Sequence, residues 1–149
     1  MNTDIVNQIS ARDRIFGKLC FEAENSYKQE NYFSALACLF VLTEQIVKFI
    51  VENQFIDFEK EVLKENEKYW AFWKYKKYAY DNNLITKEEN ELILFISECR
   101  NNVFHSNLYP TGLEIEGKFW SFSENDTLEI LYKKYSAKVF ELVFRVISS

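Results

Sequence analysis

Hydrophobic residues recur at three- and four-residue steps along most of this chain, which predicts long amphipathic helices. In the N-terminal part, this spacing predicts one helix over about 4–30, with Gly17 as a point of bending or weakness. A break near 29–31 leads into a second helix over about 32–54. This second helix is apolar around much of its circumference, which predicts a central and buried position.

The next helical pattern covers about 58–82 and is split or weakened before Tyr69. It ends at Asn82-Asn83, because asparagine tolerates a left-handed backbone. A further helix begins at Thr86, since Thr86 and Glu89 have the spacing of a capping box. Its apolar stripe consists of Leu92, Phe95, Ile96, Cys99 and Val103.

The pattern changes after Ser106. Residues 109–112 have the composition of a turn, and apolar and polar residues then alternate on either side of Gly117. This alternation predicts a short β-hairpin or an extended flap near 113–122. A last helix follows, capped by Ser123 or Asn125, and its apolar face consists of Leu128, Leu131, Tyr135, Val139, Leu142 and Val146.

These elements predict an all-α fold, a single domain over 1–149 built as an antiparallel bundle of four to five helices. The chain has only 3 Gly and 1 Pro, which favours long uninterrupted helices. Three cysteines, Cys20, Cys38 and Cys99, lie in apolar helical pattern and predict buried free thiols in a reducing cytoplasm. No window holds 18 uncharged apolar residues and no signal peptide is evident, so we expect a cytoplasmic protein without a membrane span.

The net charge of −5 does not favour nucleic-acid binding by the molecule as a whole, so RNA contacts require a local patch. Residues 68–78 form the clear positive cluster, in which lysines are interleaved with aromatic residues. Lysines neutralise phosphates and aromatic rings stack on bases, so the candidate contacts with single-stranded RNA are Trp73, Lys74, Lys76 and Lys77. The alternative is an amphipathic helix that buries Trp70 and Trp73 and leaves the lysines in solvent.

The segment 98–105 holds the only histidine of the chain, His105, five positions after Arg100. Histidine can take and give a proton near neutral pH, and arginine offers a planar charged fork to phosphate oxygens. On a continuous helix these two side chains lie about 140° apart, whereas Asn101 and His105 share a face. Either the helix loosens near Phe104, or two chains complete the site across a two-fold axis, which we favour. The structural alternative is a histidine that interacts with the helix dipole.

An arginine followed by a polar residue, and by a histidine after four to six intervening residues, resembles the signature of the HEPN superfamily. The match is 100–105, and the helix that opens at Tyr32 and carries Glu44 is similar to the second helix of the family. The resemblance implies an all-helical, metal-independent endoribonuclease that needs no cofactor and cuts single-stranded RNA. It also implies a homodimer whose two motifs line one cleft. Such domains act as toxins or in antiviral defence, so an antitoxin or defence-system protein is a candidate partner.

By this resemblance, Arg100 would hold the scissile phosphate and stabilise its growing charge. His105 would act as general base on the ribose 2′-hydroxyl or as general acid on the leaving 5′-oxygen. Asn101 would orient His105 or the phosphate, and Glu44 would support these groups without touching the substrate. Family toxins controlled by a nucleotidyltransferase antitoxin often carry a tyrosine two residues after the histidine. Asn107 stands there, which weakens the expectation of that kind of control.

Other function classes fit the sequence less well. One histidine and no paired cysteines predict no zinc site, and the Glu-x-x-His pairs of a di-iron bundle are absent. Three dispersed glycines do not form a phosphate-binding loop. Two rivals to the nuclease remain: a catalytically silent HEPN-like module that binds a partner protein or nucleotide, and a plain helical interaction protein.

Overall fold

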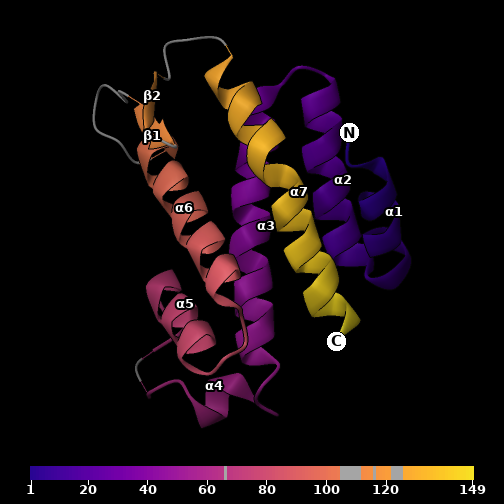
Figure 1. Cartoon of the computed structure of the whole chain (residues 1–149). Coiled ribbons are helices and arrows are strands. Elements are labelled where there is room, and N and C mark those ends of the chain that lie inside the picture. Colours follow the sequence, from indigo (N-terminus) through magenta and orange to yellow (C-terminus); the bar gives the residue numbers. More distant parts are fainter. Residues whose placement is uncertain (66, 105–111, 116, 122–125) are drawn as a thin grey trace.

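The computed structural model describes residues 1–65, 67–104, 112–115, 117–121 and 126–149; for 102–104, 112–115, 119 and 120 it describes the backbone alone. The fold is all-α, as the sequence predicts (Figure 1). The described helices are α1 Thr3–Arg12, α2 Arg14–Lys28, α3 Tyr32–Glu52, α4 Phe58–Glu61, α5 Phe72–Asp81, α6 Lys87–Phe104 and α7 Thr127–Ser148.

Two short strands lie between α6 and α7, β1 Gly112–Ile115 and β2 Lys118–Ser121. They pair antiparallel, with Leu113 opposite Trp120. Gly117, between the strands, has φ 77°, a left-handed backbone that glycine adopts without strain. The strands fall in the segment where alternation predicts a hairpin, and a role as a flap stays a prediction.

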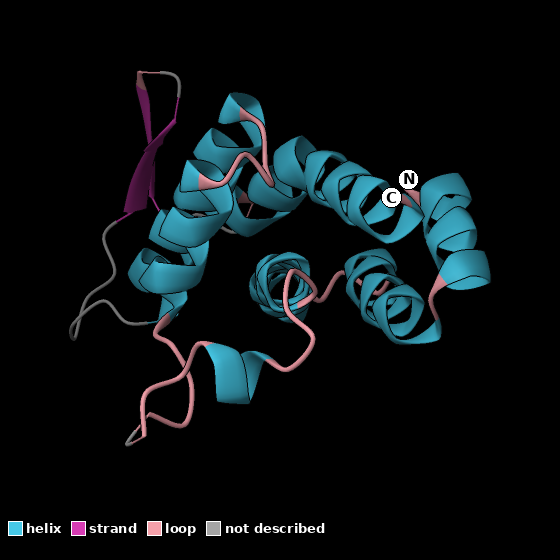
Figure 2. Ribbon diagram, turned by 90° about the horizontal axis from the view of Figure 1, so that it is seen from below, coloured by secondary structure: helices cyan, strands magenta, loops and turns pink. Residues whose placement is uncertain are grey.

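Helix α3 is the centre of the bundle. Seen from below, it is viewed end-on with the other helices around it (Figure 2). Helices α2, α5, α6 and α7 all pack on it, and Leu39, Leu42 and Ile46 are fully buried. By length and composition α3 could also cross a membrane, but half of its apolar stretch is buried inside the protein. Burial against the neighbouring helices is sufficient reason for this composition.

The prediction of one helix over 4–30 is wrong, because the chain breaks at Asp13. The Asp13 backbone is extended, with φ −144° and ψ 115°, and its carboxylate accepts a hydrogen bond of 2.9 Å from the Phe16 N–H. This contact caps α2. Gly17 lies inside α2 rather than at the break. A Cβ on Gly17 would lie 2.5 Å from Ser10 Cα, so the glycine lets α1 and α2 pack closely.

The other predicted helix boundaries agree better with the structure. The 58–82 segment is split as predicted into α4 and α5, and Asn83, just after α5, has φ 58°. The Thr86 capping box is confirmed: the Thr86 N–H donates to the Glu89 carboxylate at 2.8 Å, and the Glu89 N–H donates to Thr86 Oγ1 at 3.1 Å. The predicted caps of the last helix, at 123 and 125, lie outside the described residues.

In the predicted apolar stripe of α6, Ile96 and Cys99 are buried and Leu92 and Phe95 are partly buried against the core. The stripe omits Ile93, which is fully buried. The buried face is wider than one stripe because α6 contacts α3, α5 and α7. The Val103 side chain lies outside the described residues. All three cysteines are free; Cys20 and Cys99 are buried, whereas Cys38 is half-buried.

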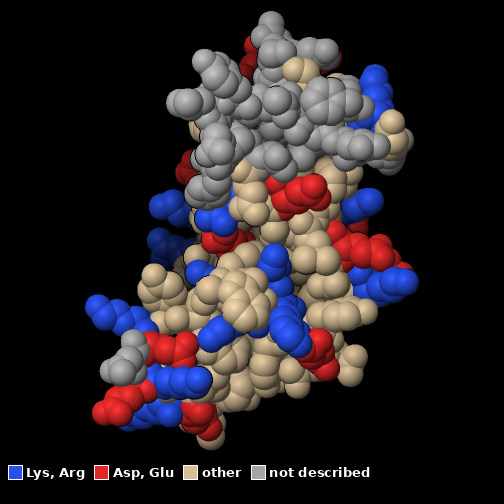
Figure 3. Space-filling model, turned by 90° about the vertical axis from the view of Figure 1, so that its left-hand side faces the viewer, with Lys and Arg blue, Asp and Glu red and all other residues tan. Residues whose placement is uncertain are grey.

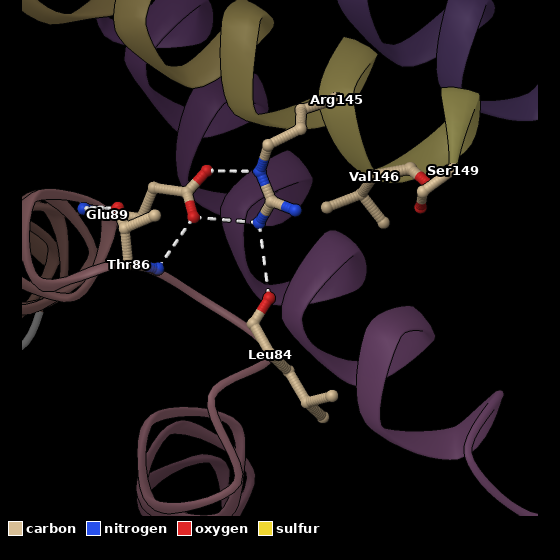
Figure 4. Close-up of polar contacts among 6 residues, drawn as sticks. All are labelled: Leu84, Thr86, Glu89, Arg145, Val146 and Ser149. Atoms are coloured by element: carbon tan, nitrogen blue, oxygen red, sulfur yellow. Dashed lines mark hydrogen bonds and ion pairs between the residues drawn. The ribbon is translucent and has the colours of Figure 1, made fainter.

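One carboxylate ties the start of α6 to the end of α7. Arg145 Nε and Nη2 donate to the two oxygens of Glu89 at 2.6 and 2.7 Å, and Nη2 also donates to the Leu84 carbonyl at 3.2 Å (Figure 4). Since the same carboxylate belongs to the capping box with Thr86, the helix cap and the bidentate ion pair support each other. This network fixes the beginning of the helix that carries Arg100.

A buried polar cluster joins the N-terminal residues to α2 and α7. The Glu24 carboxylate accepts hydrogen bonds of 2.7 Å from both the Asn2 N–H and the Tyr132 hydroxyl. Burial alone would raise the pKa of Glu24, but these donors hold it below its ordinary value. The cluster therefore keeps a buried carboxylate ionised.

Candidate functional site

The motif arginine on α6 contacts the acidic residue on α3. Arg100 Nη1 lies 2.8 Å from Glu44 Oε1, and both side chains are partly exposed, at 37% and 20%. The sequence places Arg100 on the flank of the apolar stripe, and the structure agrees with that position. Glu44 touches Arg100 directly, and its role in supporting the motif residues stays a prediction.

Within the described part of the chain, the Glu44 contact occupies one nitrogen of the Arg100 guanidinium. Glu44 Oε1 is buried, and among the described residues it has a charge partner but no aligned hydrogen bond. Arginine carries five N–H donors in a planar fork, and Glu44 approaches it at one nitrogen. Arg100 can therefore remain next to Glu44 and still donate to a second anion, such as a phosphate.

Lys76 on α5 adds a third charge to this region. Partial burial lowers the pKa of Lys76, while the negative charge of Glu44 acts in the opposite direction. The Lys76 ammonium also lies 5.4 Å from the centre of the Phe72 ring.

Helix α5 is fixed on α3 by Tyr75. This side chain is only 1% exposed, and its hydroxyl donates to Glu52 Oε1 at 2.7 Å. Burial, followed by the hydrogen bond to Glu52, raises the pKa of Tyr75 far above its usual range. Tyr75 therefore stays a neutral donor, and it holds α5 where Lys76 lies within the field of Glu44.

Two of the predicted catalytic residues are not shown in contact with Arg100. Asn101 is exposed on α6, and as the next residue it lies about 100° around the helix from Arg100. His105 lies outside the described residues. Whether His105 reaches the phosphate site of its own chain or of a second chain stays a prediction.

The structure divides the predicted RNA-binding cluster between two places. Lys76 lies in the field of Glu44, whereas Trp73, Lys74 and Lys77 line a separate depression of about 340 Å³. On the face that carries α5 and α6, basic and acidic side chains lie interspersed over the lower half (Figure 3). The alternative of burying both tryptophans is wrong for Trp73, which is 58% exposed; Trp70 is half-buried.

The sequence analysis did not predict the acidic partners of Lys74 and Lys77. Lys77 Nζ lies 2.6 Å from Asp81 Oδ2, and Lys74 Nζ lies 3.6 Å from Glu67 Oε2. The spacing of four residues between Lys77 and Asp81 was a usable signal for the first pair. No local signal places Glu67 beside Lys74, because the chain between them is not helical up to Phe72.

No group of three or more His, Cys, Asp or Glu that could hold a metal ion occurs among the residues described. Comparison with known proteins adds no identification: no family model, no curated protein and no solved structure matches this chain. The HEPN resemblance therefore depends on the motif residues themselves.

Proposed function

We propose that this protein is a HEPN-type, metal-independent endoribonuclease that cuts single-stranded RNA as a homodimer, within a toxin or antiviral defence system. The observation that carries this proposal is the 2.8 Å contact between Glu44 and Arg100. It joins the two positions, one on the long apolar helix and one in the arginine–histidine motif, on which the resemblance depends.

In the proposed reaction, the ribose 2′-oxygen bonds to phosphorus and the bond from phosphorus to the 5′-oxygen breaks. His105 of one chain takes the 2′-hydroxyl proton, and the partner subunit's His105 gives a proton to the leaving 5′-oxygen. Arg100 donates to the non-bridging oxygens, where negative charge increases in the transition state. The products carry a 2′,3′-cyclic phosphate and a 5′-hydroxyl.

Glu44 and Lys76 have supporting roles in this proposal. The Glu44 carboxylate orients the guanidinium at one nitrogen and leaves its other donors for the phosphate. Lys76 restores the positive charge that Glu44 removes, so that the region attracts a phosphodiester. A site preorganised in this way loses little conformational freedom when RNA binds.

The proposal is tested by cleavage of 5′-labelled single-stranded RNA in the presence of EDTA. We expect wild type to produce cyclic-phosphate ends, and Arg100→Ala and His105→Ala to lower the rate at least 100-fold. Arg14→Ala, at an exposed arginine on α2, is the matched control and should cleave like wild type. If all variants cleave equally, or if wild type leaves a panel of RNAs intact with EDTA or with Mg²⁺, the nuclease proposal is wrong.

The same contact also favours the second candidate, a catalytically silent module. An arginine that already has a carboxylate partner has a sufficient structural role in joining α3 to α6. In that case wild type would not cleave RNA, whereas Arg100→Ala would lower the melting temperature. Loss of cleavage by Arg100→Ala with an unchanged melting temperature would support the nuclease.

A further inference from the structure

A surface depression beside α5 combines aromatic and basic side chains. It has a volume of about 340 Å³, enough for a nucleobase with its sugar, and its lining includes Trp70, Trp73, Lys74, Lys77 and Tyr78. Lysines and aromatic rings side by side are the composition of surfaces that bind single-stranded nucleic acid. The composition of this lining therefore favours binding of a nucleic-acid ligand over a role in helix packing alone.

Trp73 is the ring that a ligand can reach. It is 58% exposed, an unusual state for so large an apolar side chain. Trp70, by contrast, is held edge-on against Phe58 with ring centres 5.2 Å apart, and its centre lies 6.0 Å from that of Tyr78. The depression thus has fixed aromatic walls and one exposed indole.

Lys74 and Lys77 form ion pairs beside the depression, and both side chains remain accessible to solvent. Lys77 pairs with Asp81 and Lys74 with Glu67, and in each pair the lysine is exposed or partly exposed. Solvent-exposed ion pairs contribute little to stability, so both ammonium groups can turn to a phosphate at small cost. A third lysine, Lys64, lies at the same depression.

We propose that this depression is a binding subsite for single-stranded RNA, in which one base stacks on Trp73 while Lys74 and Lys77 contact the flanking phosphates. The choice of RNA as the ligand rests on the proposed function. Helix α5, which supplies Trp73, Lys74 and Lys77 to the depression, contacts α6, the helix that carries Arg100. A strand bound there would continue across α5 towards the cleavage site.

Base stacking is tested with a fluorescein-labelled 2′-O-methyl decauridylate, which lacks the 2′-hydroxyl and so cannot be cleaved. We expect fluorescence anisotropy to show at least tenfold weaker binding for Trp73→Ala and at most threefold weaker binding for Trp73→Phe, which keeps a ring for stacking. The matched control is Tyr69→Ala, because Tyr69 is a 73% exposed aromatic residue outside the depression. It should bind like wild type.

The phosphate contacts are tested by the double variant Lys74→Gln/Lys77→Gln. We expect its affinity to fall about tenfold at low salt, and the slope of log affinity against log salt to decrease by about 1.4, roughly 0.7 for each lost phosphate contact. Lys87→Gln, at an exposed lysine at the start of α6, is the control and should leave both quantities unchanged. Circular dichroism checks that each variant is folded.

Several results would overturn this subsite. These are no binding by wild type, equal losses for Trp73→Ala and Tyr69→Ala, or equally tight binding of AMP, which would indicate a mononucleotide site. The outcome is separable from that of the nuclease proposal because the probe cannot be cut. Trp73-dependent binding without cleavage of any RNA would support the subsite and refute the nuclease. Cleavage of RNA with the same KM in wild type and Trp73→Ala would support the nuclease and refute the subsite.

Discussion

Glu44 and Glu24 show how the surroundings of a carboxylate decide what it does. Glu44 is partly exposed and contacts Arg100 at one nitrogen, where it can orient the guanidinium and leave its other donors for a ligand. Glu24 is buried and accepts hydrogen bonds from Asn2 and Tyr132. Its carboxylate therefore joins the N-terminal residues, α2 and α7. The first arrangement suits a binding site and the second suits stability.

The Glu24 cluster predicts a pH-dependent stability. Because the pKa of Glu24 is lower in the folded than in the unfolded chain, its contribution is complete above the unfolded pKa of about 4.3 and is lost as pH falls through the folded pKa. Glu24→Gln should lower the free energy of unfolding by about 1–3 kcal/mol at pH 7, since a buried donor loses its acceptor. This deficit should shrink towards pH 3.

Urea unfolding of wild type and Glu24→Gln at pH 7, 5 and 3.5 measures this effect. The exposed Glu65→Gln serves as the control and should change stability by less than about 0.5 kcal/mol. A deficit of constant size across this pH range would mean that the ionised carboxylate is not the stabilising group.

Helix pairs are the next scale, and Gly17 shows how one missing side chain sets the distance between two of them. Helices α1 and α2 are joined by a break at a single residue, Asp13, and pack closely where Gly17 meets Ser10. Gly17→Ala should cost about 1–3 kcal/mol, because the added Cβ meets backbone that cannot rotate away. The gain in helix propensity, about 1 kcal/mol, offsets only part of the strain.

Thermal and urea unfolding of Gly17→Ala test this expectation, with Lys18→Ala as the neighbouring exposed control. The control should stay within about 0.5 kcal/mol of wild type. Equal stability of Gly17→Ala and wild type would show that α1 can move away from α2 without loss.

At the scale of the whole molecule, the proposed nuclease requires two copies. If the arginine and histidine at one phosphate come from different chains, mixing inactive Arg100→Ala with inactive His105→Ala should recover a measurable part of the activity. Mixed dimers then hold one intact Arg100 and one intact His105 in the same cleft, and water takes the place of the second histidine, so only part of the activity returns. The measurement is RNA cleavage after co-refolding, with each variant refolded alone as the control. Absence of recovery in a verified mixed dimer would mean that one chain supplies both groups or that the reaction needs both histidines, and a dimer of wild type with His105→Ala distinguishes these two outcomes.

Helix type and several helix ends could be predicted from local sequence. The Thr86 capping box, the stop at Asn82-Asn83 and the apolar surface of α3 depend on residues within a few positions of one another. The break at Asp13 has a local cause too, because the Asp13 side chain caps α2 in the middle of a continuous helical pattern of apolar residues. The width of the α6 core was not accessible in this way, since it depends on which helices pack against Ile93.

The sequence by itself determined the class of fold, the central place of α3 and the residues with suitable chemistry, because helical periodicity, capping and side-chain charge are local properties. Only the tertiary structure decided that Glu44 touches Arg100 and that Trp73 is exposed at a depression that Lys74 and Lys77 also line. Helices α3, α5 and α6 bring these groups together through packing between residues far apart in the chain, and no local spacing encodes such contacts.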